Sequence, residues 1–135
     1  MDNDKYLEWT ERVAEAEAYH DRILEKYENY LFNKEGDVKA VENHIRLLSF
    51  YANQYLLQSD IKLIHQSSGE VITFLQKYFV EKCLWADKKS MIDYIHAFKL
   101  LYNYFSEIEM IPNKDFLILK QKFEEAEEDL VNYKY

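Results

Sequence analysis

The feature that most constrains this chain is a regular spacing of large apolar residues between Lys88 and Ile111. These residues recur at steps of three and four positions, which places them on one side of an α-helix. They are Met91, Ile95, Phe98, Tyr102, Phe105 and Ile108. No glycine or proline interrupts the stretch, and Pro112 follows it at a point where a helix cannot continue. The pattern predicts a helix at the centre of the core.

Turn-forming residues are scarce in the whole chain, which has 2 Gly and 1 Pro among 135 residues, whereas 48% of the residues are hydrophobic. This composition favours helices joined by short loops over a sheet protein. We predict an all-α fold, a helical bundle of about five helices in one domain of residues 1–135. A long amphipathic N-terminal helix occupies 1–36, a helical core 37–111 and a C-terminal helix 112–135.

The two terminal helices carry apolar stripes with the same three-four spacing. The first is expected from about Asp4 to about Asn33, and its stripe consists of Tyr6, Trp9, Val13, Ala16, His20, Ile23, Tyr27 and Tyr30. The last is expected from about Asn113 to about Tyr133, with Phe116, Leu119, Phe123, Ala126, Leu130 and Tyr133 in its stripe. The two helices could pair within one chain or contribute to a dimer, and the sequence leaves both arrangements open.

The first boundary of the central core is marked by Gly36, a helix stop, and Asp37, an N-cap. The second helix is expected from Val38 to about Leu57. Its buried stripe is predicted to contain Val38, Val41, Ile45, Leu48, Ala52 and Tyr55.

Two further caps are predicted in the core. Ser67 and Glu70 have the spacing of a capping box, so a third helix is expected to begin there and to end near Cys83. Asp87 is expected to cap the fourth helix.

The charge and cysteine content limit the class of protein. The formal net charge is −8, which argues against nucleic-acid binding by bulk electrostatics. The acid is mostly at the two ends, because residues 37–111 hold 8 basic and 9 acidic side chains. The single cysteine, the charged first residues and the lack of an apolar run of ~20 residues indicate a cytoplasmic protein with no membrane span.

The residue types that carry chemistry are scattered. The four histidines, His20, His44, His65 and His96, show no metal-ligand spacing, and Cys83 is expected to be a packed thiol. His20 interrupts the stripe of the first helix, either as a tolerated polar position or buried at a helix seam where its charge would matter below about pH 6.5. We predict no enzyme activity, no catalytic residue, no metal and no cofactor, and the sequence identifies no small-molecule substrate.

A few polar side chains are candidates for contacts to a partner. Three share a face of the second helix, two lie in the first turn of the fourth helix, where positive charge opposes the helix dipole, and one lies farther along that helix. They are Lys39, Asn43, Arg46, Lys88, Lys89 and Lys99. They can be ordinary surface residues, or contacts to a phosphate or to a protein.

The central segments DVKAVENHIRLLSFYANQYLL and SSGEVITFLQKYFVEKCLWADKKSMIDYIHAFKLLYNYFSEIEMI resemble the SAM-like core-binding domain of phage-type tyrosine recombinases (integrases). The last segment matches that family's pattern at Tyr94, Ala97, Lys99 and Tyr102 and departs from it at Asp93. The resemblance implies a SAM-like four-helix core that clamps duplex DNA through helix faces. It also implies no strand cleavage, because the family's separate catalytic domain has no counterpart after Ile111.

Two functions follow from these patterns. The first is a non-catalytic helical protein-interaction module that uses its helix seams. It is expected to self-associate into a homo-oligomer, or to bind a protein partner. The alternative is a DNA-binding protein derived from a tyrosine recombinase core-binding domain, without recombinase activity.

Overall fold

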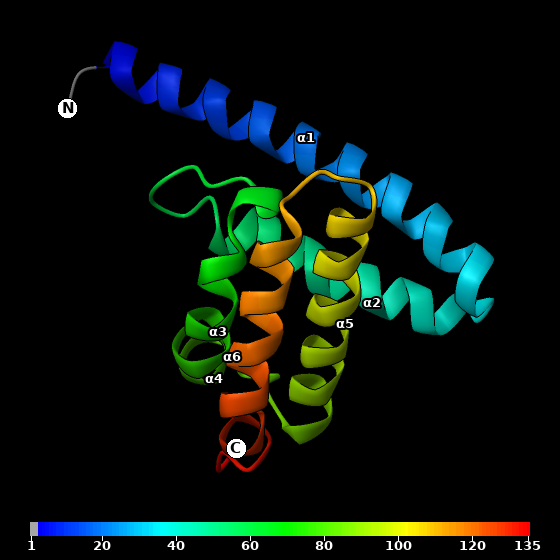
Figure 1. Ribbon diagram of the computed structural model, residues 1–135. Coiled ribbons are helices and arrows are strands. Elements are labelled where there is room, and N and C mark those ends of the chain that lie inside the picture. The colour runs from blue at the N-terminus through cyan, green and yellow to red at the C-terminus, as the bar shows by residue number, and fades with distance from the viewer. Residues whose placement is uncertain (1–2) are drawn as a thin grey trace. The chain divides into compact units, whose positions relative to one another are not determined.

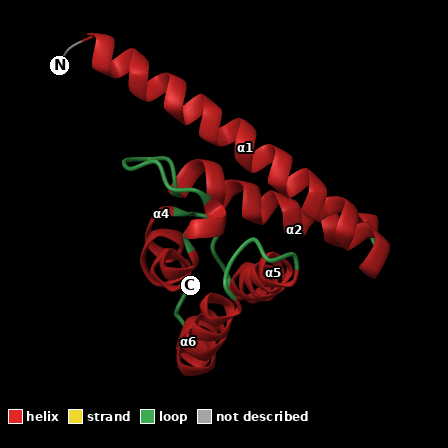
Figure 2. Cartoon of the chain, turned by 45° about the horizontal axis from the view of Figure 1, so that its top comes forward, coloured by secondary structure: helices red, strands yellow, loops and turns green. Residues whose placement is uncertain are grey.

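The computed structural model describes residues 3–135, and their secondary structure is helical, with no strand in that range (Figures 1 and 2). The predicted all-α fold with about five helices is therefore confirmed. Its helices are α1 (Asn3–Glu35), α2 (Val38–Phe50), α3 (Val71–Thr73), α4 (Val80–Lys82), α5 (Lys88–Glu107) and α6 (Asn113–Val131). Two π-helical segments, η1 (Tyr51–Tyr55) and η4 (Phe74–Phe79), continue α2 and join α3 to α4.

The described residues form two compact units, Met1–Ile64 and His65–Tyr135, each with helices that contact one another. In the first unit, α1 turns back into α2 at Gly36, whose φ of 72° is the left-handed conformation that glycine adopts without strain. The Asp37 side chain accepts hydrogen bonds from the backbone N–H groups of Lys39 and Ala40, at 3.1 and 3.4 Å. The predicted stop and N-cap are both confirmed.

The core of the first unit lies between α1 and the helix formed by α2 and η1. On α1 the buried side chains are Ala16, His20, Ile23, Leu24, Tyr27 and Leu31. On the opposite helix they are Val41, His44, Leu47, Leu48, Tyr51 and Ala52. The predicted stripe of the second helix was wrong at Val38, which is 54% exposed because it lies in the first turn.

The second helix does not stay α-helical to Leu57 as predicted. It ends as an α-helix at Phe50 and continues as the π-helical η1 to Tyr55, where the N–H of Leu56 donates to the carbonyl of Tyr51 at 3.0 Å. A π-turn holds more residues than an α-turn, so it rotates the following side chains out of the three-four register. Leu56 and Leu57 are consequently buried just beyond it.

The predicted capping box at Ser67 and Glu70 was wrong. Ser67 makes no side-chain cap bond, and its carbonyl instead accepts the N–H of Glu70 at 3.0 Å in a single 3₁₀ turn, η3 (Ser68–Glu70). Ser67 is buried, so its side chain does not lie at an open helix end. Another 3₁₀ turn, η2 (Ile64–Gln66), precedes it, and the helical run of α3, η4 and α4 ends before Cys83 as expected.

In the second unit α5 and α6 lie side by side (Figure 2). α6 also contacts α3 and η3. The predicted stripe of α5 is buried from Met91 to Phe105, whereas Ile108 is 51% exposed. The helix ends at Glu107 and not at Ile111, because the N–H of Met110 donates to the carbonyl of Phe105 at 2.8 Å and the chain turns there. On α6 the buried residues are Leu119, Phe123 and Leu130; Tyr133, predicted to be buried, lies beyond the helix and is 45% exposed.

In the part of the chain that the structure describes, no helix is both long and apolar enough to cross a membrane.

Candidate functional site

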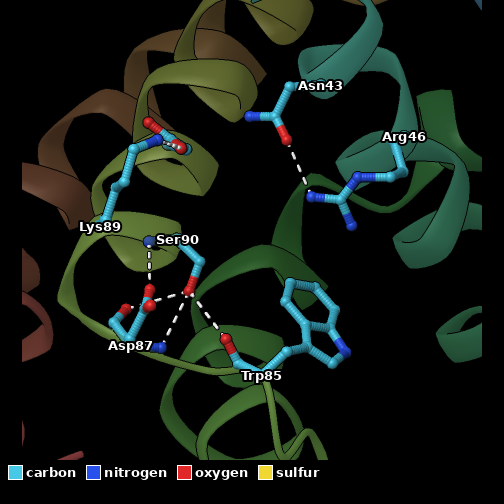
Figure 3. Close-up of polar contacts among 7 residues, drawn as sticks. Asn43, Arg46, Trp85, Asp87, Lys89 and Ser90 are labelled. Carbon is cyan, nitrogen blue, oxygen red and sulfur yellow. Dashed lines mark hydrogen bonds and ion pairs between the residues drawn. The ribbon is translucent and has the colours of Figure 1, made fainter.

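The polar face predicted on α2 is present in the structure. Arg46 donates from Nη2 to Oδ1 of Asn43 at 2.8 Å (Figure 3). Lys39, four residues before Asn43, is exposed at the start of the helix. The amide of Asn43 holds the guanidinium against the helix, one turn away. The face therefore offers a fixed guanidinium and a separate, solvated ammonium.

Two of the three lysines predicted as contacts on α5 are paired with carboxylates of their own unit. Lys89 bonds to Asp93 at 2.9 Å along the helix, and Lys99 bonds to Glu127 of α6 at 2.8 Å. The hydrogen bond and negative charge of Asp93 raise the pKa of Lys89. Lys88 is exposed in the first turn. Because Asp93 and Glu127 reduce the net positive charge around these lysines of α5, they attract a phosphate backbone less than the sequence suggested.

The first turn of α5 is held by a reciprocal cap between Asp87 and Ser90 (Figure 3). The N–H of Ser90 donates to Oδ1 of Asp87 at 2.7 Å, and the N–H of Asp87 donates to Oγ of Ser90 at 2.9 Å. Hydrogen bonding of the carboxyl by the backbone N–H and the side chain of Ser90 holds the pKa of Asp87 below its usual range. The predicted Asp87 cap is confirmed, and it places a negative charge beside the two lysines.

Replacing Asp87 by alanine is expected to lower the melting temperature by a few degrees, because the N–H of Ser90 in the first turn loses its acceptor. Replacing it by asparagine, which keeps an accepting oxygen, should retain most of the stability. Since the folded carboxyl has the lower pKa, its contribution is present above about pH 4 and is lost as the pH falls through the folded value. Thermal melts followed by circular dichroism, recorded between neutral and acid pH, measure both effects; equal melts for all three proteins would contradict them.

The buried polar residues of the first unit form a network that the sequence indicated only through His20. His20 is fully buried; its Nδ1 lies 3.1 Å from Oδ1 of Asn53, and its Nε2 accepts the N–H of Ile64 at 3.0 Å. Because a backbone N–H can only donate, the proton of the neutral ring is on Nδ1. The amide of Asn53 in turn donates to Asp21 at 3.3 Å. The network ties α1, η1 and the loop after it together.

A second buried histidine in the same unit pairs with a tyrosine. The Tyr27 hydroxyl and His44 Nε2 lie 3.0 Å apart, and both residues are buried between α1 and α2. Sequence reasoning placed no role on His44. Its place on the buried face, three residues after Val41, was the available signal.

The N-terminal third of α1 exposes its apolar side chains. All residues from Asn3 to Arg12 are exposed, among them Tyr6 at 53% and Trp9 at 38%. Tyr6, Trp9 and the half-buried Val13 continue, at steps of three and four, the face that is buried from Ala16 onward. The apolar seam of α1 is therefore longer than the surface that covers it. We call these three side chains, Tyr6, Trp9 and Val13, the open seam.

A groove of about 520 Å³ runs between α5 and α6 in the second unit. Its apolar lining residues are Ile92, Ile95 and Val131, which we call the floor residues, and its polar lining residues, called the rim, are His96, Lys99, Asn132, Glu124, Glu127 and Glu128. The groove could not be predicted from the sequence, because it depends on which faces of two helices meet.

No group of three or more His, Cys, Asp or Glu side chains among the described residues is arranged to hold a metal ion. Burial raises the pKa of the Cys83 thiol, which opposes formation of the nucleophilic thiolate.

No protein-family model, curated protein or solved structure matches the chain. The resemblance to recombinase core-binding domains therefore stays a prediction.

Proposed function

We propose that the chain is a non-catalytic helical protein-interaction module that self-associates through the open seam of α1. The observation that carries the proposal is the exposure of Tyr6 and Trp9 on the same helical face that is buried from Ala16 onward. Large apolar side chains on one exposed face are typical of association surfaces. Aromatic residues also supply much of the binding energy where proteins associate.

The geometry of the first unit favours an antiparallel pair of α1 helices. Within each chain, α2 and η1 cover α1 up to about Ala16, where Asn53 meets His20. In a parallel pair the partner helix would run into the space that α2 and η1 occupy. In an antiparallel pair the two open seams overlap. The covered part of each α1, from Ala16 onward, then lies beyond the N-terminal end of the other α1.

The overlap is short, because the uncovered residues from Asn3 to Val13 span only ~16 Å at 1.5 Å per residue. A contact of this length buries less area than the interfaces of stable dimers. The proposal is therefore a concentration-dependent dimer that forms and dissociates readily.

Light scattering across a concentration series tests this proposal with two matched variants. Trp9→Glu places a charge in the open seam, so it should weaken dimerisation at least about tenfold, an effect expected of a central aromatic contact. Leu7→Glu adds the same charge to a 57% exposed residue that is outside the seam, and it should leave the dimer intact. A wild-type mass that stays monomeric at every concentration would overturn the proposal, and so would equal weakening by both variants.

The DNA-binding alternative finds less support in the described residues. Lys89 and Lys99 are paired with acids, and Arg46 is held by Asn43. Lys39, Arg46 and Lys88 are exposed, and Arg46 keeps its positive charge because Asn43 is a neutral amide, so half of the predicted set has no acid bonded to it in these contacts. DNA binding therefore stays a prediction.

A further inference from the structure

The groove between α5 and α6 has the size and lining of a small-ligand site. Its volume of about 520 Å³ lies in the range of pockets that hold small molecules. Most of the exposed lining is apolar, from Ile92, Ile95 and Val131, and polar groups stand along the edges. The Ile92 side chain lines the groove and is 47% exposed. An apolar group placed there would cover part of that side chain.

The charge on the rim selects the kind of ligand. Lys99 neutralises Glu127 at 2.8 Å, and its ammonium also lies 5.6 Å from the centre of the Phe123 ring. Glu124 and Glu128 remain, and among the described residues neither is paired with a cation. Their four-residue spacing places two like charges on one face of α6, where they repel each other.

We propose that this groove binds a small amphiphilic cation, a molecule with a short apolar chain that ends in an ammonium group. The chain would lie on Ile92, Ile95 and Val131, and the ammonium would lie between Glu124 and Glu128. Such a ligand relieves the repulsion of the two carboxylates and covers apolar surface at the same time. The site is separate from the open seam, so this inference is independent of the proposed self-association.

The matched probes are hexylammonium, hexanoate and hexanol, which share a six-carbon chain and differ in the charge of the end group. The readout is the methyl carbon–hydrogen correlation spectrum of the full chain, in which the floor residues Ile92, Ile95 and Val131 report on the groove. Hexylammonium should shift these signals in a saturable way, hexanol should do so more weakly, and hexanoate should not. Added salt should weaken the hexylammonium effect, because exposed charges are screened.

The matched variants are two pairs of Glu→Gln substitutions with the same spacing. Glu124→Gln with Glu128→Gln should weaken hexylammonium binding about fivefold, which is what two exposed carboxylates contribute. Glu11→Gln with Glu15→Gln, on α1, removes the same charge elsewhere and should leave binding unchanged. The inference is overturned if the floor methyl signals do not respond, or if hexylammonium and hexanol bind equally. Equal binding to both pairs of variants would overturn it as well.

Discussion

Replacing Phe74 by alanine is expected to lower the free energy of unfolding by about 4 kcal/mol, near the upper end for core truncations. Phe74 is fully buried at the start of η4. Its ring centre lies 5.2 Å from Tyr94 and 6.2 Å from Phe98, both in edge-on geometry. Truncation removes these aromatic contacts and leaves a cavity among rings of α5 that cannot collapse into it.

Chemical denaturation followed by circular dichroism measures this loss. Phe116→Ala is the matched control, because it is the same chemical change at a half-buried position of α6 and should cost roughly half as much. Phe74→Leu, which restores most of the volume, should also cost less than Phe74→Ala. An equal loss at Phe74 and Phe116 would contradict the prediction, because the full burial and the ring contacts of Phe74 would then add nothing to the cost of truncation.

The long helices were predictable because their local signals agree with their packing. The first helix was predicted from Asp4 to Asn33 and extends from Asn3 to Glu35. Asp87 was predicted as a cap, and the stripe from Met91 to Phe105 is buried. An uninterrupted three-four pattern, bounded by a cap and a stop residue, fixes both the face and the length of a helix.

The two π-helical segments could not be predicted from this pattern. Tyr51–Tyr55 and Phe74–Phe79 have the same apolar composition as an ordinary helix, and no glycine or proline marks them. Each segment begins at a large ring, Tyr51 or Phe74, that is fully buried, so these turns lie where tertiary packing is dense. That packing is tertiary, so periodicity alone does not record it.

Periodicity also shows which face is apolar but not how far that face is covered. Val38, Ile108 and Tyr133 fit the predicted stripes, and all three are exposed at or beyond helix ends. The open seam has the same origin. Tyr6 and Trp9 continue the apolar pattern of α1 toward the N-terminus, before the first buried residue, Ala16. A sequence pattern therefore overestimates burial at the ends of elements.

The candidate contact residues show a similar limit. The pairing of Lys89 with Asp93 was visible in the sequence, because oppositely charged residues four apart on a helix are neighbours. The pairing of Lys99 with Glu127 was not visible, because it joins α5 to α6 across 28 positions. The groove between those helices depends on the same tertiary contact and was missed for the same reason.

Replacing His20 by leucine is expected to lower the free energy of unfolding by about 3 kcal/mol. The side chain is fully buried, so leucine fills most of the space but offers no acceptor to the N–H of Ile64 and no donor to Asn53. Leaving a buried donor without a partner costs about 1–3 kcal/mol, and the partly buried Asn53 adds to this. His96→Leu is the same change at an exposed position and should stay within about 0.5 kcal/mol of wild type.

The same network makes the stability of the first unit depend on pH. Protonation of Nε2 in His20 would turn an acceptor into a donor facing the N–H of Ile64, so the folded form keeps the neutral ring. The nearest carboxylate in the network, Asp21, bonds to Asn53 and not to the ring. The unfolded chain takes up a proton below about pH 6.5, and stability therefore falls as the pH drops through that range.

Denaturation curves at several pH values between 5 and 8, about the range over which a histidine titrates, separate this effect from others. Burial lowers the pKa of His65 as well, so His65 gives a slope of the same sign, which wild type and His20→Leu share. The difference between the two proteins isolates His20: His20→Leu should be less stable at every pH, with the smallest gap at acid pH. If the gap did not change with pH, the ring of His20 would be able to accept a proton in the folded state, and the hydrogen bond from Ile64 would not hold it neutral.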